Sequence, residues 1–152
     1  MPTKLTTTLN KIPSVPNPTN SAIINEFYQY MKNNDASIHH QNNNLKVIIA
    51  FANFLSPNIT FYDIQRKEQS LAFLDTKVKK PDQDPERRWI TTWNHYLNRI
   101  KLFLRWLYNY RGRKSDGEII SSEWKTPTFA KIKGKKTKRQ SPYLETEIWD
   151  RD

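Results

Sequence analysis

The sequence predicts an all-α protein of four or five helices, and two observations support this prediction. Apolar residues recur at intervals of three and four in three separate stretches, as they do along one face of an amphipathic helix. The alternation of apolar and polar residues that is typical of a strand is almost absent. The length of 152 residues suits one domain. We expect a disordered arm at 1–19, a helical domain at 20–112 and an extended basic linker at 113–152.

The first helix is expected to follow the arm. Residues 1–19 are polar, rich in Thr and interrupted by four prolines, which remove backbone donors and disfavour helix. Asn20 or Ser21 is then a suitable helix cap, because its side-chain oxygen accepts hydrogen bonds from free backbone amides. The apolar residues of this helix share one face: Ile23, Ile24, Phe27, Tyr30 and Met31.

The second helix is expected to begin after Ser37 and to end before Pro57. Its apolar stripe comprises Leu45, Ile48, Ile49, Ala52 and Leu55. The first two turns are polar instead and include His39, His40 and three consecutive asparagines at 42–44. Asparagine has a poor helix propensity, so this run indicates a role other than local stability.

Two further helical units complete the bundle. A short one lies within residues 58–80 and starts near Thr60 or near Arg66; residues 81–84 form a turn. The long helix spans 85–110, with Asp84 as its cap and Pro85 at its first position. Its wide apolar face comprises Trp89, Trp93, Tyr96, Leu97, Ile100, Phe103, Leu104 and Leu107. Its other side carries Asn94, Asn98, Lys101 and Arg105, with His95 and Arg99 beside them.

The C-terminal part loses this periodicity. Residues 124–129 contain two aromatic residues that could anchor a return strand or an extended strap. A run of six positive charges without an acid follows: Lys131, Lys133, Lys135, Lys136, Lys138 and Arg139. Such a run is either a solvated tail or a strap that follows a phosphate backbone.

Composition narrows the classes of function. The absence of cysteine excludes disulfides and cysteine-ligated metals, and three glycines make a Gly-rich phosphate loop improbable. We find no catalytic constellation, no metal-ligand spacing and no cofactor motif, so we expect neither enzyme activity nor a bound cofactor. No apolar segment has the length of a membrane span or a signal peptide, and we expect a cytoplasmic protein.

The charge balance points to a polyanion. Twenty-five Lys and Arg against 15 Asp and Glu give a net charge of +10. Candidate contacts on the long helix are Arg87, Arg88, Asn94, His95, Asn98, Arg99, Lys101 and Arg105; those on the second helix are His39, Asn42, Asn43 and Lys46. Four alternatives remain open: solvated polar faces without a ligand, an RNA-binding module, a standalone enzyme, and a protein adaptor with an exposed aromatic patch around Trp93, Phe103 and Leu107.

Several segments together resemble the N-terminal core-binding (SAM-like) domain of tyrosine recombinases and phage-type integrases. The likeness runs from about residue 20 to 152. It rests on NSAIINEFYQYM, FANFL, ITFYDIQRKEQSLAFLD and DPERRWITTWNHYLNRIKLFLRWLYN, while the tail EWKTPTFAKIKGKKTKRQSPYLETEIWDRD is similar to the interdomain linker of archaeal integrases.

The resemblance implies half of a C-shaped clamp around double-stranded DNA, acting in DNA integration and site-specific recombination, with other recombinase protomers as further partners. Catalysis in that family belongs to a second domain. No His-x-x-Arg pair occurs here, so we expect no strand cleavage, and we expect Tyr143 to anchor the linker. A DNA-bound protein of this kind would be associated with the nucleoid, without a membrane or small-molecule partner.

The family's second and fourth helices approach the DNA. Carried over by position, this implies contacts from Asn42, Asn43, Lys46, Arg88, His95, Asn98, Arg99 and Lys101. The asparagine run departs from the Thr, Tyr and Arg that are commoner in the family at this place. We therefore expect phosphate contact rather than base-specific recognition from the second helix.

Overall fold

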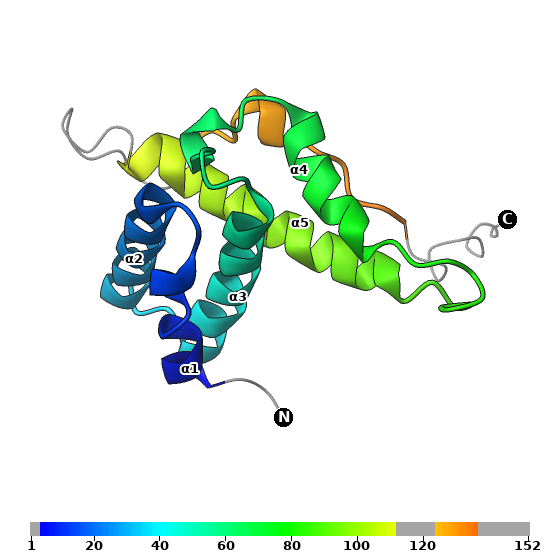
Figure 1. The fold of residues 1–152 in the computed structure, drawn as a ribbon, viewed down its shortest axis with the longest axis horizontal. Helices are drawn as coiled ribbons and strands as arrows, with labels where there is room; N and C mark the ends of the chain where they lie inside the picture. The colour runs from blue at the N-terminus through cyan, green and yellow to red at the C-terminus, as the bar shows by residue number, and fades with distance from the viewer. Residues whose placement is uncertain (1–3, 112–123, 137–152) are drawn as a thin grey trace, which may run out of the picture.

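The long helix α5 (Trp89–Trp106) is the element against which most of the fold packs (Figure 1). The computed structural model describes residues 4–111 and 124–136. These residues contain five α-helices and no β-strand, which confirms the all-α prediction. The other helices are α1 (Leu5–Leu9), α2 (Pro18–Asn33), α3 (Ile38–Phe54) and α4 (Lys67–Leu74). In Figure 1, α1, α2 and α3 lie together below α5. Helix α4 lies on the other side of α5, next to the N-terminal half of that helix.

The N-terminal segment is folded, contrary to our expectation for most of it. Residues 4–19 form α1 and a 3₁₀ turn, η1 (Ile12–Ser14), before α2 begins. Ile12 and Val15 are buried in the core, and the side-chain hydroxyl of Thr8 donates to Oδ1 of Asn42 on α3 at 2.6 Å. The four prolines are therefore compatible with a short, irregular segment that folds against the bundle. Residues 1–3 lie outside the described residues.

Helix α2 begins three or four residues earlier than the predicted caps, Asn20 or Ser21, imply. The cap is Asn17, whose Oδ1 accepts from the backbone amides of Thr19 and Asn20. Asn20 itself is fully buried and has a different task. Its amide donates to the carbonyl of Ile59 at 3.0 Å, and its Oδ1 accepts from the amide of Phe61 at 2.9 Å. Asn20 thus ties α2 to the connection that leads out of α3.

Helix α3 begins where expected, because Ser37 accepts from the backbone amide of His40 at 3.1 Å. The predicted apolar stripe is buried, and Phe51, which is not part of that stripe, is also completely buried. Two of the three consecutive asparagines are buried as well: Asn42 against α1, and Asn44, whose amide donates to the carbonyl of His40 at 2.9 Å. Part of the asparagine run is therefore structural, which a poor helix propensity does not indicate.

The short third unit starts at both places that the sequence left open. A 3₁₀ turn, η2 (Phe61–Asp63), follows Thr60, whose backbone amide donates to the carboxylate of Asp63 at 2.9 Å. Helix α4 then follows Arg66, whose backbone amide donates to the side chain of Gln69 at 2.9 Å. A second 3₁₀ turn, η3 (Asp75–Lys77), extends α4 toward the loop before α5.

Helix α5 begins at Trp89, four residues later than predicted. Asp84 does serve its N-terminus, because its carboxylate accepts from the backbone amide of Trp89 at 2.8 Å. Pro85 instead lies in the turn between them, and Arg87 has a φ of 53°, in the left-handed region that interrupts a helix. At the other end a π-helical turn, η4 (Leu107–Arg111), continues α5.

Aromatic side chains fill the centre of the bundle. Phe103 of α5 packs against Phe27 of α2 and Phe61 of η2, with ring centroids 5.2 and 4.7 Å apart. Trp106 stacks on Phe27 at 5.0 Å, and Phe51 reaches Phe61 at 6.0 Å. Edge-to-face and tilted pairs of this kind add to the free energy gained by burial. This cluster fixes α2, α3 and α5 relative to one another.

Residues 124–136 form an extended strap that runs back along α5, interrupted by a 3₁₀ turn, η7 (Thr128–Ala130). Trp124, Ala130 and Ile132 are buried in the same core as the helices. Trp124 therefore anchors the strap, as predicted. This part of the expected linker packs on the helical domain and does not lead away from it.

Candidate nucleic-acid interface

Helix α5 and two of the elements that pack against it contain no acidic residue. Helix α3, helix α5 and the strap contain no Asp or Glu. The acids of the described residues all lie elsewhere: Glu26, Asp35, Asp63, Glu68, Asp75, Asp82, Asp84 and Glu86. Because α5 packs against both α3 and η7, the acid-free elements form one continuous part of the molecule. We call the surface of α3, α5 and residues 124–136 the acid-free face.

The cations of the acid-free face make no ion pair within the described parts of the chain. They are Lys46, Arg99, Lys101, Arg105, Lys125, Lys131, Lys133, Lys135 and Lys136. The ion pair seen among the described residues joins Arg88 to Glu86 at 3.1 Å, just before α5, and both side chains are largely exposed. A cation without a carboxylate partner is free to neutralise a phosphate and release its counterions.

Arg99 is the least compensated of these cations. It is half-buried, and its Nε is buried without a hydrogen-bond partner. Two half-buried imidazoles lie near it, His40 on α3 and His95 one turn earlier on α5. Burial lowers the pKa of both histidines, and the positive charge of Arg99 lowers each pKa further. At neutral pH these imidazoles are uncharged, and the guanidinium is left to attract an anion.

A second group of cations lines a hollow of about 340 Å³ between α5 and the strap. Lys101 contributes from α5, and Lys131 and Lys133 contribute from the strap. The two strap lysines flank Ile132, which is buried in the core and holds the backbone in place. Lys131 and Lys133 are both exposed.

Lys135 continues this row in a different environment. Its Nζ lies 4.7 Å from the ring centroid of Trp93 and 5.9 Å from that of Trp89. A cation over an aromatic face is held by the negative charge of the π system. The side chain is thus oriented along α5, while the neighbouring Lys136 is exposed.

Two predicted ligand-binding residues of α5 hold the strap instead. The side-chain amide of Asn94 donates to the carbonyl of Lys135 at 2.7 Å, and its Oδ1 accepts from the amide of Lys135 at 2.8 Å. Arg105 donates to the carbonyl of Trp124 at 3.0 Å. Asn109 makes the same reciprocal pair with Lys125, at 2.8 and 3.0 Å. We assigned Asn94 and Arg105 to a free polar face because the sequence does not show that the strap returns to α5.

The other candidates divide into accessible and inaccessible residues. Asn98 is exposed, and Asn43 and Lys46 of α3 are half-buried. Asn42 is buried against Thr8, so we correct its assignment as a ligand contact. Lys138, Arg139 and Tyr143 lie outside the described residues.

His40 was not among our chosen site residues, although a signal for it exists. His40, Asn44, Val47 and Phe51 follow one another at steps of four, three and four, so they share one side of α3. The last three are buried, and this side faces α5. The first turn of the stripe therefore places His40 at the edge of the contact between α3 and α5.

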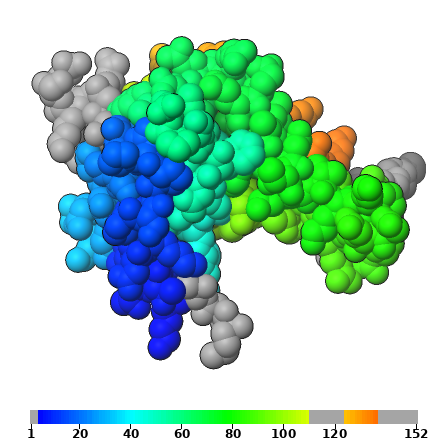
Figure 2. All heavy atoms as spheres, in the orientation of Figure 1, coloured from blue at the N-terminus to red at the C-terminus, as the bar shows by residue number. Residues whose placement is uncertain are grey.

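Figure 2 shows that the molecule is indented on the viewed face. The column of α1 and α3, blue to cyan, forms one wall, and the green segment from η3 to the start of α5 forms the other.

Trp93, Phe103 and Leu107 are buried, so they do not provide the aromatic docking patch that an adaptor would need.

No protein-family model, curated protein or solved structure matches the chain. Within residues 4–111 and 124–136, no helix is both long enough and apolar enough to cross a bilayer. In the same ranges no three His, Asp or Glu side chains come together as a metal site would require.

Proposed function

We propose that this chain binds double-stranded DNA along the acid-free face, mainly through backbone phosphates. The observation that carries the proposal is Arg99, a half-buried cation that has no carboxylate partner among the described residues and lies near His40 and His95 on an acid-free surface. An unpaired charge that is partly removed from water is unfavourable, and a phosphate would relieve this cost. The lysines of the strap add long-range attraction on the other side of α5.

The proposed context is DNA integration or site-specific recombination, with the chain as the DNA-gripping, non-catalytic part of a tyrosine recombinase. The resemblance assigns DNA contact to the second and fourth helices of the core-binding domain. Here these correspond to α3 and α5, the two long helices that carry no acidic residue. In this role other recombinase protomers on the same DNA are partners, and the protein is associated with the nucleoid.

The test is the salt dependence of duplex binding, measured by fluorescence anisotropy with a labelled duplex of about 25 base pairs. Four to six phosphate contacts predict a slope of about −4 to −5 for log affinity against log salt. A slope shallower than about −2, or no binding at about 50 mM salt, contradicts the proposal. Equal or tighter binding to an RNA stem-loop would instead favour the RNA-binding alternative.

Arg99→Gln isolates the central residue of the proposal. Each phosphate contact makes the binding constant vary with the salt concentration to the power of about −0.9. The loss of one contact therefore weakens binding about eightfold at about 0.1 M salt. Lys32→Gln is the matched control, because Lys32 is an exposed cation on α2, outside the acid-free face. Circular dichroism should show the same helix content in both variants. Equal affinity of the two variants would remove Arg99 from the interface.

A further inference from the structure

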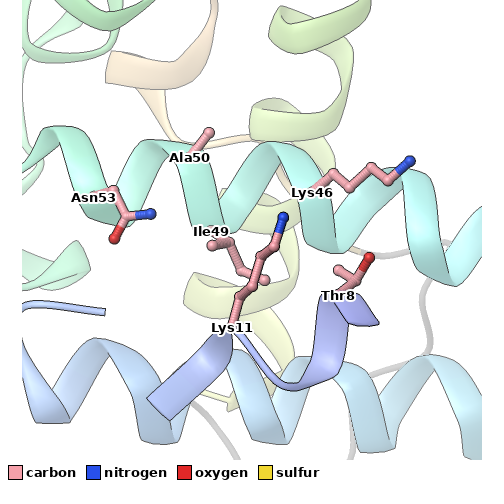
Figure 3. Close-up of a pocket in the computed structure, with 6 residues that line it drawn as sticks. All are labelled: Thr8, Lys11, Lys46, Ile49, Ala50 and Asn53. Atoms are coloured by element: carbon pink, nitrogen blue, oxygen red, sulfur yellow. The ribbon is translucent and has the colours of Figure 1, made fainter. Parts of the chain in front are cut away.

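A groove of about 290 Å³ separates the N-terminal segment from α3 (Figure 3). Thr8 and Lys11 line it from the N-terminal side. The α3 side is formed by Lys46, Ile49, Ala50 and Asn53. The groove exists because residues 4–19 are folded, so it has no counterpart in a disordered arm.

The two walls of the groove are fixed relative to each other. Thr8 is 1% exposed, and its hydroxyl donates to Asn42 of α3 at 2.6 Å. On the other side of Lys11, Ile12 is 1% exposed in the core, and its carbonyl accepts from the hydroxyl of Ser21. Lys11 is therefore held between two anchored residues, which places its side chain over α3.

The groove carries two cations, one from each wall. Lys11 comes from one wall and Lys46 from the other, and Figure 3 shows Lys11 extending toward α3 beside Ile49. Neither lysine makes an ion pair with a described residue. No acid occurs in residues 4–25 or 36–62, which make up both walls. The groove is thus positive on both sides.

The floor of the groove is aliphatic. Ile49 is 4% exposed and Ala50 is half-buried, while Thr8 and Asn53 supply polar atoms at the rim. A deoxyribose has a carbon face that suits such a floor, and the phosphate attached to it suits the two lysines. Arginine binds an anion through two parallel hydrogen bonds, whereas the ammonium group of a lysine acts as a point charge.

We infer that this groove binds one phosphodiester group of the DNA backbone, shared between Lys11 and Lys46, with the adjoining sugar over Ile49 and Ala50. The inference rests on the proposed function and deepens it. It adds the N-terminal segment to the DNA contacts of α3 and α5, so the strand would continue past α3 to the surface of residues 4–19.

The experiment compares Lys11→Gln, Lys46→Gln and the double variant by duplex binding over a series of salt concentrations. A single shared phosphate predicts that the double variant loses about 0.9 in slope and about eightfold in affinity at about 0.1 M salt. Two lysines on separate phosphates would lose about 1.8 in slope. Lys32→Gln is the control, since Lys32 is exposed on α2 and lies outside both the groove and residues 4–19.

The outcomes separate this inference from the proposed function. Duplex binding by the native chain with an unchanged slope in the double variant overturns the groove alone, as does a slope loss near 1.8. No duplex binding by the native chain overturns the proposed function, and the groove assignment with it. Inorganic phosphate is titrated separately into ¹⁵N-labelled protein. Saturating shifts at Lys11 and Lys46, combined with unaffected duplex binding in the double variant, would identify a small-anion site and overturn the DNA assignment.

Discussion

Asn94→Ala should loosen the strap, and Asn98→Ala provides a control of the same residue type on the same helix. Asn94 makes two hydrogen bonds to the backbone of Lys135, at 2.7 and 2.8 Å, whereas Asn98 is exposed and makes none to a described residue. Each of these bonds lies at an exposed site, where about 0.5–1 kcal/mol of net stabilisation is typical. The gain in helix propensity from Asn to Ala is common to both variants and cancels in the comparison. We therefore expect Asn94→Ala to be about 1–2 kcal/mol less stable than Asn98→Ala.

Two measurements test this difference. Urea denaturation followed by circular dichroism gives the free energy of unfolding of each variant. Amide hydrogen exchange reports on the end of the strap directly, because the Lys135 amide donates to Asn94. Exchange at Lys135 should be about five- to thirtyfold faster in Asn94→Ala than in Asn98→Ala. Equal stability together with equal exchange at Lys135 would show that the strap does not depend on Asn94.

Three further predictions concern the core and the histidine pair. Asn20→Ala should lower the free energy of unfolding by about 2–4 kcal/mol in a urea titration, because it leaves a buried amide and a carbonyl without partners, while the exposed Asn25→Ala on the same helix should change it little. Phe103→Ala should cost about 3–5 kcal/mol, since the fully buried ring packs on Phe27 of α2 and on Phe61 of η2; a loss below about 1 kcal/mol would contradict the described core. Because burial and a nearby guanidinium lower the pKa of His40 and His95 in the folded chain, the unfolded chain binds more protons, so stability is fully present above about pH 6.5 and falls as the pH drops through the folded values. A bound phosphate raises both pKa values, so duplex affinity should increase on acidification over the same range, and an NMR titration of the two imidazoles with and without DNA checks the sign.

Local patterns were sufficient to identify helices α2 to α5, though not every boundary, and most of the core. The spacing of Ile23, Ile24, Phe27 and Met31 identified the buried face of α2, and the hydroxyl of Ser37 identified the start of α3. These predictions succeeded because periodicity and capping act within a few residues of the chain. The N-terminal segment was predicted wrongly, because its prolines disfavour a long helix but exclude neither the short helix α1 nor the burial of Ile12 and Val15.

The candidate interface depended on contacts between distant segments. Asn94 and Asn98 have equal standing in the sequence, yet one is bound to Lys135, 41 residues away, and the other is exposed. Asn42 and Asn43 are neighbours in one polar run, and only the first is buried against Thr8. A polar side chain hydrogen-bonds to whichever group packing brings near, so its type does not reveal whether its partner is protein or ligand.

The sequence by itself determined that the chain is helical, strongly basic and free of acids over the stretches that became α3, α5 and the strap, because composition and short-range spacing are properties of the chain alone. The tertiary structure decided which cations have no carboxylate partner among the described residues. Arg99, Lys46 and the lysines of the strap make no ion pair within residues 4–111 and 124–136, because folding packs the acid-free stretches against one another.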